Sequence, residues 1–229
     1  MTATALVFGA SGAIGGAIVN RLADDGYEVW QAGRTAGAEK TILIDSGQPA
    51  TYANVENVPQ LSAVVWAQGV NHNDSITDIE SRHLRGVLEA NTLMILDSMH
   101  ALLTAKRLLF GARCCVVSSV WQVVTRRNKL SYTVSKAALD GVVRSTAADL
   151  AADGILVNAV LPGVIDTPMT RSVLSAEEIE AFERANGFGR LISLDDVANT
   201  VSFLCSPRNT GITGQSIVVD LGFAHERNL

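Results

Sequence analysis

The sequence predicts an α/β fold with a doubly wound, parallel, seven-stranded sheet and helices on both of its faces. Short apolar segments alternate with longer helical patterns from end to end, which is typical of parallel strands joined by crossover helices. The strand segments are apolar nearly throughout, as expected when helices cover both faces of a sheet. Because crossovers between parallel strands are right-handed, ligands should bind outside the carboxyl ends of the strands.

The expected elements follow one another without a break. The first strand is expected at Ala3–Phe8, and a helix follows directly at Ala13–Asp24. The other strands are expected at Glu28–Ala32, Thr41–Ile44, Ala63–Ala67, Cys114–Ser118, Leu156–Leu161 and Ser216–Val219. The other helices are expected at Ser81–Lys106, Ser131–Ala152, Ala176–Asn186 and Leu194–Leu204. Asp45–Gln60 contains two prolines and little periodicity, so any helix there is short. No repeat, low-complexity tract or linker divides the chain, so we expect a single domain over residues 1–229.

Composition excludes several classes of protein. Apolar residues make up 48% of the chain and charged residues 18%, so a large core can form and a disordered or fibrous chain is excluded. The net charge of −5 gives no general attraction to nucleic acid or anionic lipid. The N-terminus runs into an apolar strand without a basic leader, and no apolar stretch has membrane-spanning length. We expect a soluble, cytoplasmic protein with neither a nucleic-acid nor a membrane partner.

The three cysteines predict neither a disulfide framework nor a metal site. Cys114 and Cys115 are adjacent and point to opposite faces if they lie on a strand, and Cys205 makes the count odd. No cluster of histidines at ligand spacing lies nearby. We expect reduced cysteines packed as small hydrophobic side chains.

A glycine-rich turn follows the first strand. It reads Gly9-Ala-Ser-Gly-Ala-Ile-Gly15 and passes directly into the first helix. Small residues let the backbone approach a phosphate, and a helix N-terminus offers unpaired N–H groups and the positive end of its dipole. The alternative is a tight strand–helix connection without a ligand. The position after the first strand favours a Rossmann-like dinucleotide site.

The end of the second strand bears on the choice of dinucleotide. A site for NAD tends to place an acidic residue there to accept from the ribose 2′-OH, whereas this chain has Arg34 and Thr35. A guanidinium can pair with a 2′-phosphate and stack on adenine, so NADP is favoured over NAD. The alternative is a solvated loop arginine. Asp45, at the end of the third strand, could accept from the adenine amino group or could cap a short helix.

Tyr132 and Lys136 lie four residues apart at the start of a helical pattern, so both project from one helix face. A carbonyl carbon that receives a hydride leaves charge on its oxygen, and a phenol can donate a proton there. A cation ~4 Å from the phenol contributes up to roughly 4 kcal/mol at an effective dielectric of ~20, which lowers its pKa by at most about three. Desolvation opposes this effect. The alternative is an ordinary pair on a surface helix.

Two further polar residues stand at informative positions. Ser119 follows the fifth strand, where its hydroxyl could bond a substrate oxygen or simply form a turn or helix cap. Asn91 lies inside a long amphipathic helix, where asparagine is a poor helix former, so a structural or catalytic reason is expected.

Taken together, the residues resemble the short-chain dehydrogenase/reductase family in its single-domain branch. The similarity covers nearly the whole chain, and its motifs stand in the expected order. They are Gly9-Ala-Ser-Gly-Ala-Ile-Gly15, Gly69, Asn91, Ser119, Tyr132-x-x-x-Lys136, Leu161-Pro-Gly-Val-Ile-Asp-Thr167, Gly189-Arg-Leu191 and Ile212-Thr-Gly-Gln215.

The resemblance implies a hydride-transferring enzyme with a catalytic tetrad. Tyr132 is the implied general acid/base, Ser119 positions the substrate oxygen, Lys136 holds the nicotinamide ribose and assists Tyr132, and Asn91 anchors a water in a proton relay. The assigned dinucleotide contacts are Gly9, Ser11, Gly12, Ile14, Gly15, Arg34, Thr35, Asp45, Gly69, Tyr132, Lys136, Pro162, Gly163, Ile165 and Thr167. The family often forms dimers or tetramers, so a homodimer or homotetramer is expected, acting on a small-molecule carbonyl or alcohol.

The chain departs from the family pattern at a few positions. Ala13 replaces the usual glycine, with Gly12 one position earlier, and alanine is small enough to keep phosphate binding. The family's Asn-Asn-Ala-Gly after strand four reads Trp66-Ala-Gln-Gly69, which puts the adenosine packing around Gln68 in doubt. The segment between strands three and four is short, so the adenine side of the site should be more open.

Substrate specificity should lie after Ser119 and after Thr167. Trp121, Val123 and Val124 are expected to form an apolar wall. The basic cluster of Arg126, Arg127 and Lys129 could recognise an anionic substrate or carrier, or could be a solvated loop or a subunit contact. Met169-Thr-Arg171 and the helix after it are expected to form a mobile lid hinged at Gly187 and Gly189, the alternative being a static surface helix. The tail Phe223–Leu229 could fray or dock on a neighbouring subunit.

Two other functions compete with an oxidoreductase. A catalytically silent dinucleotide-binding regulatory or interaction protein would typically lack Tyr132 or Lys136, and this chain has both. A sugar-nucleotide epimerase would need a larger C-terminal substrate region than this chain provides.

Overall fold

The computed structural model describes residues 2–35, 39–167, 170–171 and 174–225, and seven parallel strands form one sheet in its centre. The strands are β1 (Thr4–Phe8), β2 (Glu28–Gly33), β3 (Thr41–Leu43), β4 (Leu61–Trp66), β5 (Leu108–Val117), β6 (Leu156–Pro162) and β7 (Ser216–Val219). Their order in the sheet is β3-β2-β1-β4-β5-β6-β7. The order reverses between β1 and β4, which is where an open α/β sheet forms its binding crevice. The predicted fold class is confirmed.

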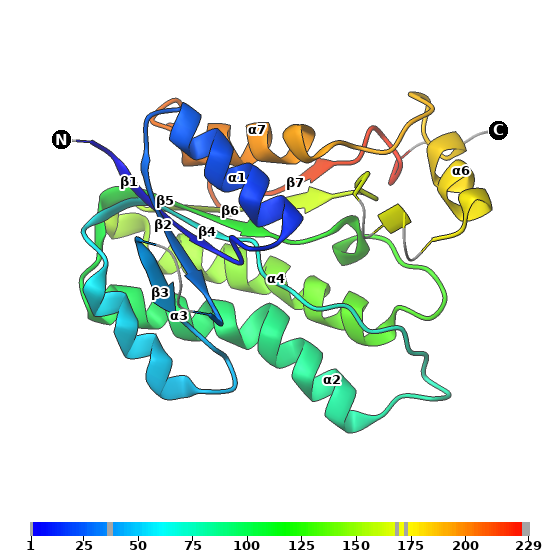
Figure 1. Cartoon of the computed structure of the whole chain (residues 1–229), viewed down its shortest axis with the longest axis horizontal. Helices are drawn as coiled ribbons and strands as arrows, with labels where there is room; N and C mark the ends of the chain where they lie inside the picture. Colours follow the sequence, from blue (N-terminus) through cyan, green and yellow to red (C-terminus); the bar gives the residue numbers. More distant parts are fainter. Residues whose placement is uncertain (1, 36–38, 168–169, 172–173, 226–229) are drawn as a thin grey trace.

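Helices cover both faces of the sheet (Figure 1). The helices are α1 (Ala13–Asp24), α2 (Ser81–Leu88), α3 (Met94–Thr104), α4 (Leu130–Asp149), α6 (Ala176–Arg184) and α7 (Leu194–Cys205), with a 3₁₀ helix at Pro49–Asn57. In Figure 1, α1 and α7 lie above the sheet and α3 and α4 below it. The helix after the glycine-rich turn, α1, and the helix that carries Tyr132, α4, therefore lie on opposite faces of the sheet. The carboxyl ends of the strands bring the turn and Tyr132 together.

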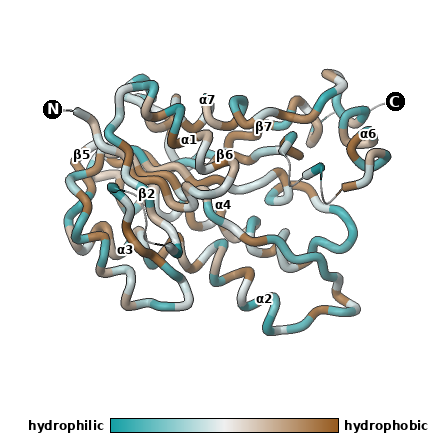
Figure 2. Tube along the Cα trace, in the orientation of Figure 1, coloured by the Kyte–Doolittle hydropathy of each residue, from teal (hydrophilic) through white to brown (hydrophobic). Residues whose placement is uncertain are grey.

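Side chains alternate between the two faces of each strand, so the sheet has a hydrophobic core on each face. In β1, Leu6 and Phe8 face the core between the sheet and helices α3 and α4, while Ala5 and Val7 face the core between the sheet and helices α1 and α7. The brown central strands of Figure 2 show this apolar interior. Cys114 and Cys115 divide in the same way between the two cores, and Cys114, Cys115 and Cys205 are all buried and free. The prediction of reduced cysteines packed as hydrophobic side chains is confirmed.

Several predicted boundaries were wrong. The strand expected at Cys114–Ser118 begins at Leu108. The first half of this strand is irregular and partly exposed, since Phe110 is 82% exposed and the pairing of the strand with β4 shifts register there. The single helix expected at Ser81–Lys106 is divided by a π-helical turn at Glu89–Leu93 and ends at Thr104. The later helices end within a few residues of their predicted positions.

The described ranges contain neither a helix that could cross a membrane nor a cluster of metal ligands. None of the helices there has the length and apolarity that crossing a bilayer requires. No group of three or more potential metal ligands occurs among those residues.

Candidate active site

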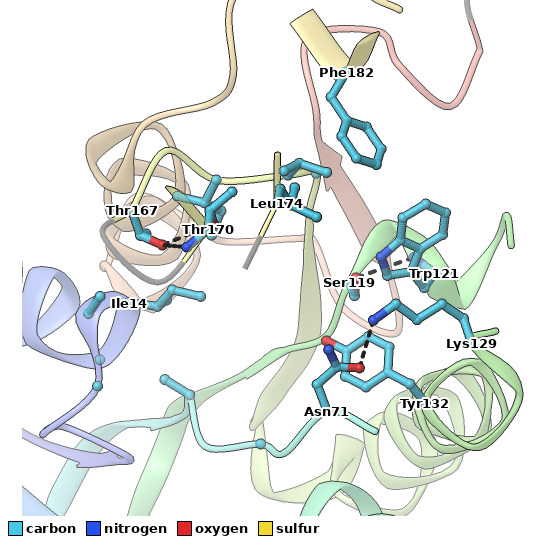
Figure 3. A pocket seen from close by; sticks show the side chains of 18 of the residues that line it. Ile14, Asn71, Ser119, Trp121, Lys129, Tyr132, Thr167, Thr170, Leu174 and Phe182 are labelled. Atoms are coloured by element: carbon cyan, nitrogen blue, oxygen red, sulfur yellow. Dashed lines mark hydrogen bonds between the residues drawn. The ribbon is translucent and has the colours of Figure 1, made fainter. Parts of the chain in front are cut away.

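The carboxyl ends of the strands open into one pocket of about 400 Å³. It lies between the glycine turn and the start of α4. Figure 3 shows Ile14, Thr167 and Thr170 on one side and Ser119, Trp121 and Tyr132 on the other, with Phe182 above. Of the predicted site residues, those lining it are Gly12, Ile14, Gly15, Gly69, Ser119, Tyr132, Gly163, Ile165 and Thr167.

Close approach of backbones explains two of the glycines in the turn. Gly9 has φ +74°, and a Cβ there would lie 2.6 Å from the backbone nitrogen of Gln68. A Cβ on Gly15 would lie 2.1 Å from the carbonyl oxygen of Gly9. Neither position can accept a side chain without moving the backbone. Gly12 differs, since its nearest neighbour would be the Gly9 oxygen at 3.4 Å and it faces the pocket.

The N-terminus of α1 is open. Its N-cap residue, Gly12, provides no side-chain hydrogen bond, and the first turn contains no acidic residue. In contrast, α6 and α7 begin with capping boxes, Ser175 with Glu178 and Ser193 with Asp196. The first N–H groups of α1 therefore remain available to an anionic group at this end of the pocket.

A separate, smaller hollow of about 170 Å³ is lined in part by Ser11, Gly33 and Thr35. Arg34 is exposed beside it, at the end of β2. The contact of Thr35 and Arg34 with a 2′-phosphate stays a prediction. The Asp45 carboxylate is hydrogen-bonded within its own loop, where it accepts from the Gly47 N–H at 3.0 Å and from Gln48 Nε2 at 3.1 Å. The alternative that Asp45 caps a short helix was wrong, since the N-cap of the 3₁₀ helix is Gln48 and no side-chain hydrogen bond caps that helix. The contact of Asp45 with adenine stays a prediction.

Tyr132 and Lys136 lie together near the start of α4, as their spacing predicts. The Lys136 ammonium is 5.7 Å from the centroid of the Tyr132 ring and donates to the Val117 carbonyl of β5 at 3.1 Å. Lys136 is buried behind the pocket wall that Tyr132 forms. Burial lowers the pKa of Lys136 to about 8.

The predicted direction of the tyrosine pKa was wrong. Burial raises the pKa of Tyr132 above its ordinary value, and the neighbouring Ser119 side chain opposes this only in part. Desolvation of the phenolate outweighs the stabilisation that a nearby cation was expected to give. The Tyr132 phenol therefore keeps its proton to a higher pH than an ordinary tyrosine does.

Ser119 is a helix cap, one of the two alternatives for its position, and its bond to a substrate oxygen stays a prediction. Its hydroxyl caps the short 3₁₀ helix Val120–Gln122 by accepting from the Trp121 N–H at 3.3 Å. The same hydroxyl lies in the pocket wall next to Tyr132 (Figure 3).

Asn91 has a structural reason for its place inside a helix. It lies in the π-helical turn and is fully buried. Its side chain accepts from the Val70 N–H at 2.8 Å and donates to the Val70 carbonyl at 2.9 Å and to Ser135 Oγ at 2.9 Å. Gly69 lies next to both this amide and the Lys136 ammonium. Asn91 therefore fixes the loop after β4 against α4, and its role in a proton relay stays a prediction.

The segment after β6 closes the opposite wall. Pro162 is the last residue of β6, Ile165 pairs with Ile192, and Thr167 Oγ1 accepts from the Thr170 N–H at 3.1 Å. Met169 lies outside the described residues. The helix after it, α6, places Phe182 against the pocket, and whether this segment moves as a lid stays a prediction.

The substrate end differs from the sequence-based prediction in two ways. Of the expected apolar wall, Trp121 lines the pocket, whereas Val123 and Val124 do not. Phe223 of the tail packs on this chain, 6.2 Å from the Trp121 ring and 5.9 Å from the Phe182 ring. The last four residues of the predicted tail lie outside the described residues.

The basic cluster is not one surface. Arg126 and Arg127 are exposed, with Arg126 4.0 Å from Glu178, whereas Lys129 is buried and lines the pocket. Two members of the cluster, Arg126 and Lys129, line the pocket, and whether they bind an anionic substrate stays a prediction. Sequence reasoning missed the pocket residues Asn71, Leu174 and Phe182.

Comparison with known proteins agrees with this geometry. The family model described as enoyl-(acyl carrier protein) reductase matches residues 9–224. The chain is 31% identical to the 3-oxoacyl-(acyl-carrier-protein) reductase FabG of Rickettsia bellii, over 96% of this chain and 95% of that protein. The chain belongs to the short-chain dehydrogenase/reductase family. It is a family of oxidoreductases, as the motifs of the sequence indicated.

Solved structures of similar fold include a short-chain dehydrogenase family protein from Francisella tularensis. It has a TM-score of 0.88 at 26% identity and covers 99% of this chain and 100% of that one. A gluconate 5-dehydrogenase from Burkholderia cenocepacia, solved with NADP and tartrate, has a TM-score of 0.90 at 19% identity and covers 98% and 96%. At that identity the second likeness concerns the fold.

The residues present fit the dinucleotide of a short-chain dehydrogenase/reductase. The open N-terminus of α1 meets the pocket at Gly12. Both polar atoms of the Gln68 side-chain amide are buried and lack a hydrogen-bond partner within the described structure. An unsatisfied buried amide costs free energy, which a ligand that bonds to it would recover.

Proposed function

We propose that the protein is an NADP(H)-dependent oxidoreductase that interconverts a carbonyl and an alcohol on a small molecule. One observation carries the proposal. The phenol of Tyr132 and the hydroxyl of Ser119 share one pocket with the open N-terminus of α1, and the Lys136 ammonium lies directly behind Tyr132.

Each polar group has a distinct task in reduction. The Ser119 hydroxyl donates to the substrate oxygen and fixes its position, and Tyr132 donates its proton to that oxygen as negative charge develops there. The nicotinamide, when bound, supplies the hydride that the carbonyl carbon receives. The carbonyl thus gains two electrons and two hydrogens, and in oxidation the same proton returns to Tyr132.

Lys136 supports Tyr132 and the nicotinamide ribose. Its ammonium is fixed by the Val117 carbonyl, which leaves its other donors for a ribose hydroxyl and for the side of the site next to Tyr132. Asn91 keeps the loop after β4 in register with this lysine and is the proposed anchor for a water that returns the proton.

The dinucleotide contacts are proposed along the strand ends. Gly9, Ser11, Gly12, Ile14 and Gly15 would surround the pyrophosphate, and Gly69, Pro162, Gly163, Ile165 and Thr167 the nicotinamide half. Arg34 and Thr35 would meet the 2′-phosphate, since no acidic residue occupies the end of β2 to favour NAD. Asp45 would border the adenine.

The protein is also proposed to be a cytoplasmic homodimer or homotetramer. Leu93 and Leu96, beside and within α3, and Val134 of α4 are large apolar side chains exposed on helices, and their burial would favour self-association. Light scattering measures the assembly directly, and a monomer at micromolar concentration would overturn this part of the proposal.

A screen of carbonyls and alcohols with NADPH, NADH and their oxidised forms tests the function. We expect turnover, followed at the nicotinamide absorbance, and tighter binding of NADPH than of NADH in separate titrations. Tighter NADH binding would contradict the role of Arg34. Binding without turnover of any compound would contradict the enzymatic proposal and favour a silent dinucleotide-binding protein.

A further inference from the structure

A second lysine, Lys129, lies in the wall of the pocket close to Tyr132. It precedes the first residue of α4 and is 6% exposed. Its ammonium lies 5.6 Å from the centroid of the Tyr132 ring. Figure 3 shows the side chain extending along Tyr132 toward Asn71, on the side of the pocket that holds Ser119.

Two neutral side chains hold this ammonium. Lys129 Nζ donates to Asn71 Oδ1 at 2.9 Å and to Asn73 Oδ1 at 2.7 Å, both in the loop after β4. The loop is fixed to the start of α4 by Asp74, whose carboxylate accepts from the N–H and the hydroxyl of Ser131. An ammonium has three donors, so two amide oxygens leave one donor for the pocket.

The charge of Lys129 has no acidic partner. Within the described ranges, no salt bridge involves Lys129, and the charged residues lining the pocket are Arg126 and Lys129. Glu178 pairs with Arg126, and the Asp74 carboxylate is bonded to Ser131. Burying an ammonium without a counter-charge is costly, and here burial lowers its pKa to about 8. An anionic ligand entering the pocket would supply the missing charge.

We propose that the substrate carries a carboxylate next to its reacting carbon and that Lys129 binds this carboxylate. The proposal rests on the function proposed above and names its substrate class, a 2-oxo acid or the corresponding 2-hydroxy acid. The Lys129 ammonium lies beside the Tyr132 ring in the same pocket wall, so a carboxylate bound to it would lie next to the carbonyl that Tyr132 is proposed to protonate.

The rest of the pocket indicates what the carboxylate is attached to. Trp121, Leu174 and Phe182 line the side away from the glycine turn, and Phe223 packs behind the two aromatic rings. An alkyl or aryl substituent suits these walls. The Arg126 guanidinium, which also lines the pocket, lies 5.9 Å from the centroid of the Phe182 ring and 4.0 Å from Glu178. The proposed substrate is therefore an apolar 2-oxo acid, with one anionic end against Lys129.

Matched acids and esters test the assignment by activity. Benzoylformate and methyl benzoylformate have the same reacting carbonyl and differ in charge. With NADPH, we expect the wild type to prefer the acid by about tenfold to a hundredfold in kcat/KM, the range of a hydrogen bond to a charged group. Lys129→Gln should lose this preference through a higher KM for the acid, with the ester little affected. Lys129→Arg should restore part of it.

Arg127→Gln is the matched control, because Arg127 is a cation of the same loop that is exposed and does not line the pocket. It should keep the full preference for the acid. No preference in the wild type, or equal losses for acid and ester in Lys129→Gln, would overturn the proposal, the second result marking Lys129 as a structural clamp.

A binding measurement separates this inference from the proposed function. Calorimetry compares mandelate with mandelamide on the wild type and Lys129→Gln, with and without NADP. Mandelate binding that is selective over mandelamide and is lost in the variant supports the carboxylate site even if no compound is turned over. Indifference of the wild type to the charge overturns the site even if esters are reduced.

Discussion

Two lysines lie equally close to Tyr132 and are held in different ways. Lys136 and Lys129 are 5.7 Å and 5.6 Å from the centroid of its ring, and burial lowers the pKa of each to about 8. A backbone carbonyl of a central strand holds Lys136, whereas two asparagine side chains of a surface loop hold Lys129. A cation fixed by the sheet suits a task common to every substrate, and a cation fixed by a loop suits a task specific to one substrate class.

Removing the phenol between the two lysines should have the largest effect. Tyr132→Phe keeps the ring that both ammonium groups contact but removes the proton donor, so we expect kcat/KM to fall by roughly 10²–10⁴-fold. The affinity for NADPH should persist. Tyr52→Phe is the control, because the buried Tyr52 hydroxyl lacks a partner in the described structure and lies outside the pocket. Steady-state kinetics and a cofactor titration measure both, and full activity in Tyr132→Phe would remove Tyr132 from the mechanism.

Exchanging Lys136 should have the next largest effect, and it should extend to every substrate. Lys136→Met removes a charged donor worth ~1.5–3 kcal/mol, so we expect turnover of acids and esters alike to fall by about tenfold to a hundredfold. Weaker NADPH binding should accompany the loss. The comparison with Lys129 fails if Lys136→Met changes the preference for acid over ester and leaves the ester rate untouched.

The pH dependence of ester reduction tests Lys136 apart from Lys129, because a neutral ester has no carboxylate for Lys129 to bind. The expected effect is smaller than that of Lys136→Met. The Lys136 pKa of about 8 means that its ammonium is present below that pH and is lost as the pH rises through it. Because burial raises the pKa of Tyr132, the phenol stays protonated over the same range. The kcat/KM for reduction of a neutral ester should therefore decline above pH about 8. Lys136→Arg, which keeps its charge, should move that decline upward, and an unchanged decline would assign it to another group.

Substitution of Asn73 should have the smallest effect on rate, whereas substitution of Asn91 should affect both the stability of the fold and the proposed proton relay. Asn73 is exposed, and the one side-chain hydrogen bond it makes within the described residues is the bond that it accepts from Lys129. Asn73→Ala should therefore raise KM for the acid by a few-fold without changing thermal stability. Asn91→Ala removes three buried hydrogen bonds, and we expect it to destabilise the fold by ~2–3 kcal/mol. Thermal melts and KM values on the two variants show whether stability and substrate recognition divide as proposed.

The sequence predicted the strand ends well because their signals are local. The apolar β1, the glycine turn after it and the spacing of Tyr132 and Lys136 each lie within a few residues, and the sheet then brings them together. The π-helical turn around Asn91 could not be predicted, because its cause is a set of hydrogen bonds to Val70 and Ser135, far along the chain.

Lys129 shows most clearly what a sequence pattern leaves out. The sequence left open whether Arg126, Arg127 and Lys129 bind an anion or form a solvated loop or subunit contact, and it could not single out Lys129. Its burial depends on Asn71 and Asn73, which precede it by more than fifty residues and reach it only because β4 and β5 are neighbours. The direction of the Tyr132 pKa escaped prediction for a similar reason, since the degree of burial follows from tertiary packing.

Transfer of an isotope tests the central claim most directly. NADPH carrying deuterium on the transferring face of its nicotinamide is incubated with the protein and a carbonyl substrate, and the alcohol is examined by mass spectrometry. The account predicts one deuterium on the carbinol carbon in the wild type and its near absence in Tyr132→Phe over the same time. An alcohol formed without deuterium at that carbon, from fully labelled NADPH, would contradict hydride transfer at this site.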